Sequence, residues 1–253
     1  MIDIHSRVDV EGMRAAGKAA AQVLAELRPL VQPGISTAEL DAAAANLMKL
    51  HGCTSACHGY VVGRLTYPGY ICISLNDEIV HGIGRDDRFI QDGDVVSLDV
   101  VIRKNGFVGD NAYTVLVGSV PEPARKLCQA TENALMAGIS AVRPGGRVGD
   151  ISAAIQGAIQ PFGFGIVREF VGHGVGRQMH EEPQIPNWGS KGTGAKLVPG
   201  MALAIEPMVT LGSPKILMAA DGWTAQTKDG RVAAHYEHTV LVTEEGVEVL
   251  TRI

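Results

Sequence analysis

The feature that most constrains the fold of this chain is an internal repeat. The segment LVQPGISTAELDAAA, which begins at Leu30, resembles AVRPGGRVGDISAAI, which begins at Ala141. Its Pro-Gly pair at 33–34 recurs at 144–145. Each segment follows an Ala- and Leu-rich stretch of helical character and opens a second helix. We therefore expect two similar halves, with functional residues drawn from both.

Strand-like sequence follows each expected pair of helices. The first helix of each pair is expected at 13–31 and at 122–142. The expected strands lie at 94–102, 107–117, 201–206, 207–211 and 235–242. Ser36 and Glu39 form a plausible capping box for the second helix. Because runs of helices precede runs of strands, we expect an α+β fold with a curved, mainly antiparallel sheet covered by helices. One domain is expected over 1–253, with halves at approximately 13–118 and 122–245.

Composition argues against several classes of function. A formal net charge of −5 does not suggest nucleic acid or an anionic membrane as a partner. The first residues, MIDIHSRVDVEG, lack the basic end and apolar run of a signal peptide, and no uninterrupted apolar run is long enough to span a membrane. The four cysteines form no C-x-x-C pair, so we expect reduced thiols and a cytoplasmic location.

Two aspartates lie in the Val-rich part of the first half. Asp99 falls within an apolar strand, where a carboxylate is unfavourable unless it is paired or bound to a metal. If Asn105-Gly106 is a two-residue turn, Asp110 pairs with Val101, and Asp99 lies diagonally across on the same face, roughly 7–8 Å away. Both side chains could then reach one pair of ions, although a purely structural role explains these two residues equally well.

Three further candidate ligands lie in the second half. His173 stands between glycines, Glu206 ends an apolar segment, and Glu237 opens another. Taken alone, each is more readily explained as a structural histidine or a solvent-facing acid at a strand end. Four carboxylates and one imidazole together suit Mn, Fe(II), Co or Zn in a binuclear site. Two such ions bridged by carboxylates are a common arrangement for hydrolysis.

Several motifs, in one order along the chain, resemble the type I methionine aminopeptidases of bacteria. The most specific is FVGHGVGRQMHEEPQIPNW at 170–188. The others are ISLNDEIVHG at 73–82, DGDVVSLDV with the following GD at 92–110, AIEPM at 204–208 and YEHTVLVT at 236–243. The resemblance covers nearly the whole chain. It implies a pita-bread fold with pseudo-twofold halves, and removal of the initiator methionine from nascent polypeptides when the next residue is small.

The resemblance also implies roles for individual residues. The five metal ligands would be Asp99, Asp110, His173, Glu206 and Glu237. They would hold two divalent ions, Co, Mn, Fe(II) or Zn, and a metal-bridged hydroxide would attack the scissile carbonyl. Glu206 would take the proton from the attacking water, His180 would stabilise the oxyanion, and His81 would position the peptide amide.

A methionine pocket is implied by the same resemblance. Its residues would be Cys57, Tyr60, Tyr67, Cys72, Met179 and Trp223. Sulfur and aromatic side chains suit a thioether guest, although ordinary core packing also explains each of them. Three features depart from the family pattern. Met179 replaces an aromatic residue, the segment 61–66 is longer than in the common bacterial form, and His235 stands where a glutamine is usual.

Two other functions remain open at this point. A proline-specific peptidase of the same fold would usually carry a large additional N-terminal domain. A binding protein that has lost catalysis would normally lack the metal ligands. By resemblance, the expected partners are the N-termini of nascent polypeptides, at the ribosome, and the expected oligomeric state is a monomer.

Overall fold

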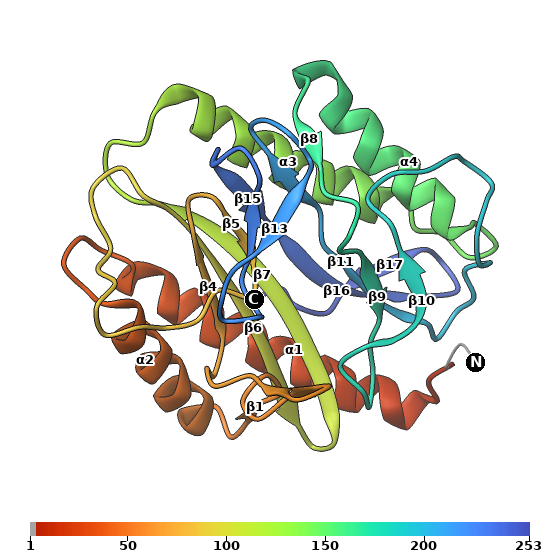
Figure 1. Ribbon diagram of the computed structural model, residues 1–253. Coiled ribbons are helices and arrows are strands. Elements are labelled where there is room, and N and C mark those ends of the chain that lie inside the picture. The colour runs from red at the N-terminus through yellow and green to blue at the C-terminus, as the bar shows by residue number, and fades with distance from the viewer. Residues whose placement is uncertain (1–3) are drawn as a thin grey trace.

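The computed structural model describes residues 4–253, in which two pairs of helices flank an antiparallel sheet (Figure 1). The helices are α1 Arg7–Leu27, α2 Thr37–Leu50, α3 Glu122–Ser140 and α4 Val148–Ile159, with short 3-10 helices η1 Arg28–Leu30 and η2 Gln160–Phe162. Figure 1 shows α1 and α2, in red, below the sheet and α3 and α4, in green, above it.

Within residues 4–253, α3 divides the strands into a first half and a second half. The first half contains β1 Thr54–Ser55, β2 Val61–Val62, β3 Leu65–Thr66, β4 Cys72–Leu75, β5 Glu78–Val80, β6 Val95–Lys104 and β7 Phe107–Leu116. The second half contains β8 Gly165–Ile166, β9 Gly172–Gly174, β10 Glu181–Ile185, β11 Ala202–Ile205, β12 Met208–Thr210, β13 Ile216–Met218, β14 Ala225–Thr227, β15 Ala233–His235, β16 Glu237–Val242 and β17 Val247–Val249.

Helix starts follow local capping chemistry. The capping box of Ser36 and Glu39 is confirmed at the start of α2. The helix expected at 13–31 begins earlier, at Arg7, because Ser6 and Asp9 form a capping box of their own. It ends at Leu27, and Pro29, which has no backbone N–H, lies in the 3-10 turn that follows.

The main sheet joins the two halves. Its order is β1-β6-β7-β16-β11-β9-β10, with β4 paired to β6 and β17 paired to β16. Contact between β7 and β16 connects a strand of the first half to a strand of the second. Two three-stranded sheets, β15-β12-β8 and β13-β14-β5, and the β2–β3 hairpin complete the strands. All of these pairings are antiparallel, so the expected α+β class is confirmed.

One expected strand is divided in the structure. The strand expected at 235–242 is two strands, because β15 ends at His235 in a small sheet and β16 begins at Glu237 in the main sheet. β11 and β12 are likewise in different sheets, and Pro207, between them, has no N–H to continue the ladder. At these two breaks, Nε2 of His235 lies 3.7 Å from Oε2 of Glu206.

Each pair of helices packs its own hydrophobic core. One buried cluster gathers residues mainly from α1, α2 and the first-half strands, and a second gathers α3, α4 and the second-half strands. Helix α1 crosses β7 so closely that a Cβ atom at Gly109 would lie 2.5 Å from the Ala16 carbonyl oxygen. Within residues 4–253, every helix is too short or too polar to cross a membrane.

Candidate metal centre

The β6–β7 hairpin has the register that the sequence predicts. Asn105 (φ +52°) and Gly106 (φ +82°) both take left-handed backbone conformations, as a two-residue hairpin turn requires. Asp110 pairs with Val101, and Asp99 pairs with Ala112. The two carboxylates therefore lie on one face of the sheet, as expected.

The same face carries the other candidate ligands across the neighbouring strands. Ala112 pairs with Asp99 on one side and with Glu237 on the other. The β11–β16 ladder ends at Ile205 and His238, and Glu206 and Glu237 are the next residues on the two strands. Ala204 pairs with His173, and because side chains alternate, Glu206 shares the face of Ala204.

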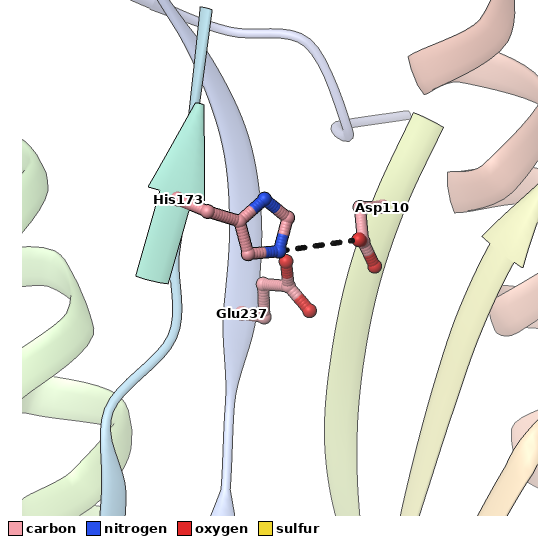
Figure 2. Close-up of side chains that lie close together, drawn as sticks. All are labelled: Asp110, His173 and Glu237. Atoms are coloured by element: carbon pink, nitrogen blue, oxygen red, sulfur yellow. Dashed lines mark ion pairs between the residues drawn. The ribbon is translucent and has the colours of Figure 1, made fainter. Parts of the chain in front are cut away.

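Three of these side chains form a tight group. Ligand atoms of Asp110, His173 and Glu237 all lie within 4.8 Å of one another, and the three side chains point toward each other from three strands (Figure 2). The Nε2 atom of His173 is 3.9 Å from Oδ2 of Asp110 and 3.3 Å from Oε1 of Glu206. Its Nδ1 lies 2.8 Å from the Gly174 carbonyl oxygen, to which Nδ1–H donates. This hydrogen bond leaves the Nε2 lone pair free for a metal.

The charges of the site favour a cation. Burial raises the pKa of Asp99 to about 7 and raises the pKa values of Asp110, Glu206 and Glu237, which the neighbouring carboxylates raise further. One carboxylate oxygen each of Asp99, Asp110 and Glu237 is buried without a hydrogen-bond partner. Neither lysine nor arginine occurs among the described residues that line the cavity. A divalent ion would satisfy these oxygens and neutralise their charge, so the residues fit a metal.

The raised pKa values predict how pH affects the metal-free protein. Between about pH 5 and pH 7 the unfolded carboxylates are ionised, whereas the folded protein retains a proton on Asp99, whose pKa burial raises to about 7. The unfolded state then binds fewer protons, so stability falls as pH rises, by about 1.4 kcal/mol per pH unit for each retained proton. We expect the Tm of the metal-free protein to fall over this range. With metal bound the carboxylates stay ionised, and the Tm should fall less; equal slopes in scanning calorimetry would contradict this.

The two non-ligand histidines lie in the same cavity. The Nδ1 atom of His180 is 3.1 Å from the Tyr60 hydroxyl, and its ring meets the ring of His173 edge-on at 4.6 Å. His81 has a backbone φ of +62°, which is uncommon for a residue with a side chain and typical of functional sites. Burial lowers the pKa of His81 to about 4 and lowers the pKa of His180, which keeps both rings neutral near pH 7.

All thirteen residues that the sequence analysis selected line one cavity of about 520 Å³. The six expected pocket residues are therefore next to the carboxylates. Cys72 pairs with Asp99 in the β4–β6 ladder. The pKa of the Cys57 thiol is raised by two effects, of which a hydrogen bond with Cys72 is the larger and burial is the second. The Tyr67 hydroxyl donates to the Gly82 carbonyl at 2.7 Å, and its ring packs edge-on against Trp223.

Three further residues lie close to the candidate site. The sequence analysis did not select Asn187 or Phe170, and it mentioned His235 only as a departure from the family pattern. Asn187 is buried and donates from Nδ2 to the backbone carbonyl of Glu206 at 3.0 Å, and Phe170 packs edge-on against His81. Both belong to the motif at 170–188, which was the available signal. His235 is buried, and its Nε2, 3.7 Å from Oε2 of Glu206, has no hydrogen-bond partner. This histidine therefore faces a candidate ligand, and burial lowers its pKa to about 3.

Comparisons with known proteins show which family the chain resembles. Residues 11–244 match the model of metallopeptidase family M24. Methionine aminopeptidase B of Synechocystis sp. is 48% identical over 244 residues, which cover 96% of this chain and 89% of that protein. The crystal structure of methionine aminopeptidase from Thermotoga maritima has a TM-score of 0.97 at 42% identity, with both chains fully covered.

A prolidase from Pyrococcus furiosus shares the fold alone. It is 23% identical with a TM-score of 0.77, and the match covers 99% of this chain and 65% of the prolidase. The expected pita-bread fold is confirmed by these neighbours, and membership of a metallopeptidase family implies use of a divalent metal. The chain belongs to metallopeptidase family M24 and, within that family, to the bacterial methionine aminopeptidases.

Proposed function

We propose that the protein removes the N-terminal methionine from nascent polypeptides, with a preference for a small second residue. The observation that carries this proposal is the set of five candidate ligands on one face of the main sheet, in a chain whose curated relatives are methionine aminopeptidases. Both halves of the repeat contribute candidate ligands. We propose one catalytic domain over 1–253, with its halves at approximately 13–118 and 122–245.

The donor set supports two divalent ions. The ligands would be Asp99, Asp110, His173, Glu206 and Glu237. Four carboxylates carry enough negative charge for two ions, and the single imidazole nitrogen is compatible with Mn, Fe(II), Co or Zn. When bound, such ions lower the pKa of water and polarise a carbonyl group.

The residues around the ligands have separate tasks in this proposal. Glu206 accepts the proton of the attacking water and passes it to the leaving amine. If the Tyr60 hydroxyl donates to Nδ1 of His180, the opposite ring nitrogen of His180 carries a proton and can donate to the developing oxyanion. His81, neutral and held in an uncommon backbone conformation, orients the peptide amide.

The part of the cavity beside the candidate ligands suits the methionine side chain of a substrate. We propose that the methionine side chain contacts the sulfur and aromatic walls of the cavity, formed by Cys57, Tyr60, Tyr67, Cys72, Met179 and Trp223. Four of these residues also belong to the first hydrophobic core, so the walls are held rigidly. The proposed setting is cytoplasmic, as a monomer that meets nascent chains at the ribosome.

A comparison of two peptides tests the function. With Mn(II) or Co(II) added, we expect hydrolysis of Met-Ala-Ser with release of free methionine, and no comparable hydrolysis of an Ala-Pro peptide. The measurement is amino-acid release by chromatography. Activity on the Ala-Pro peptide alone would instead identify a proline-specific peptidase. Inactivity on both peptides with every metal tested would favour a binding protein.

A further inference from the structure

The segment 61–66 forms a small hairpin beside the cavity. β2 pairs with β3 through Val61 with Thr66 and Val62 with Leu65, and Gly63, at φ +59°, lies in the turn. The base of the hairpin is fixed by a backbone hydrogen bond of 2.8 Å from the Tyr67 N–H to the Tyr60 carbonyl. Both tyrosines line the cavity, so the hairpin extends from the cavity wall.

The two faces of the hairpin differ in their surroundings. Paired residues share a face, so Val62 and Leu65 point one way and Val61 and Thr66 point the other. Val62 lines the cavity. A Cβ atom built at Gly222 would lie 2.8 Å from Cδ1 of Leu65, which places Leu65 next to the turn before the pocket residue Trp223. The Val62–Leu65 face is therefore the one turned toward the cavity.

This face is apolar and open to solvent. Val62 is 53% exposed and Leu65 is 41% exposed. Among the described residues that line the cavity and are exposed, Val62 is apolar, whereas the others are Glu169, His180, Glu182 and Gln184. Over residues 4–253, the exposed part of the cavity lining thus has one apolar side chain, on the hairpin, and four polar side chains. An apolar group of a substrate that extends out of the cavity meets exposed apolar surface at the hairpin.

We propose that the Val62–Leu65 face of the hairpin binds an apolar side chain of the substrate at its third or fourth residue. The inference rests on the proposed function, because an aminopeptidase encloses the first residue and leaves the following residues at the mouth. The residues of the substrate that follow the scissile bond then lie beside the hairpin and are the group that its apolar face would bind. The face acts as a specificity element, since burial of apolar surface favours substrates that can cover it.

The test compares three peptides on matched variants. Met-Ala-Ser-Ser, Met-Ala-Leu-Ser and Met-Ala-Ser-Leu are assayed for kcat/KM with Mn(II). We expect the native protein to prefer one of the leucine peptides over the all-serine peptide by about threefold to tenfold. The double variant Val62→Thr with Leu65→Thr keeps residues that favour strands and should bring this ratio close to one. Val61→Thr, the same isosteric change on the opposite face, should keep the native ratio.

Because the readout is a ratio, a loss of active protein in one variant cancels. A native ratio near one, a ratio that survives in the double variant, or an equal loss in Val61→Thr would overturn the inference while the aminopeptidase function stands. Failure of the native protein to release methionine from any of the peptides would overturn the proposed function and this inference with it.

Discussion

Replacement of Glu206 by glutamine is expected to lower kcat for Met-Ala-Ser by at least about 10³-fold. The variant loses the proposed proton acceptor, a contribution of roughly 10²–10⁴ by itself, and weakens one metal ligand. Glu206 lies within 3.3 Å of His173 and 3.7 Å of His235, so its carboxylate is at the centre of the site. The measurement is steady-state kinetics with saturating Mn(II), together with a thermal melt.

The matched control is Glu132→Gln, the same change on α3 at a position outside the catalytic cavity. It should retain native kcat. The Glu206→Gln protein should remain folded, because glutamine conserves the volume of the side chain and removes a buried carboxylate whose pKa burial raises. Turnover within tenfold of the native value in Glu206→Gln would refute the role proposed for this residue.

Replacement of Asp110 by asparagine is expected to abolish binding of at least one divalent ion per chain. Asp110 is 3% exposed, belongs to the tightest group of ligand atoms, and has one carboxylate oxygen without a hydrogen-bond partner. Loss of an ion would also remove several kcal/mol of transition-state stabilisation, so kcat should fall by about 10³-fold. Metal content after dialysis, measured by mass spectrometry, reports the binding directly.

In the absence of metal, Asp110→Asn is expected to raise the thermal stability of the protein. Asparagine removes one of several buried carboxylates that repel each other, so metal-free Asp110→Asn should melt at least about 2 °C above the metal-free native protein at pH 8. Asp87→Asn changes an exposed aspartate outside the cavity and serves as the control for both measurements. Native metal content in Asp110→Asn, or a lower melting temperature without metal, would contradict the assignment of Asp110 as a ligand.

Much of the site was predictable because short-range rules place its residues. The Asn105-Gly106 turn fixed the register of the β6–β7 hairpin, and the alternation of side chains then placed Asp99 and Asp110 on one face. The capping box at Ser36 was predictable for the same reason, since it depends on residues three apart. The motif around His173 added a ligand by resemblance, which no local rule supplies.

The less predictable features depend on contacts between distant segments. The break at Tyr236, which places His235 and Glu237 in different sheets, follows from the pairing of β15 with β12 and of β16 with β7. Asn187 contacts Glu206 across 19 residues of sequence. The role proposed for the hairpin at 61–66 could not be inferred from the sequence, because it depends on which segments lie next to its apolar face.

The sequence by itself determined the two-half organisation, the fold class and the chemical types of the ligands, because these depend on periodicity, turn residues and donor atoms. Only the tertiary structure brought the candidate ligands of the two halves onto one face. Ala112 lies between Asp99 and Glu237, residues 138 positions apart (237 − 99), and that row exists only because β7 pairs with β16. It also decided that the pocket residues and the ligands line one cavity. Burial of the carboxylates, which raises their pKa values and leaves their oxygens without partners, is a property of the packed halves and of neither half alone.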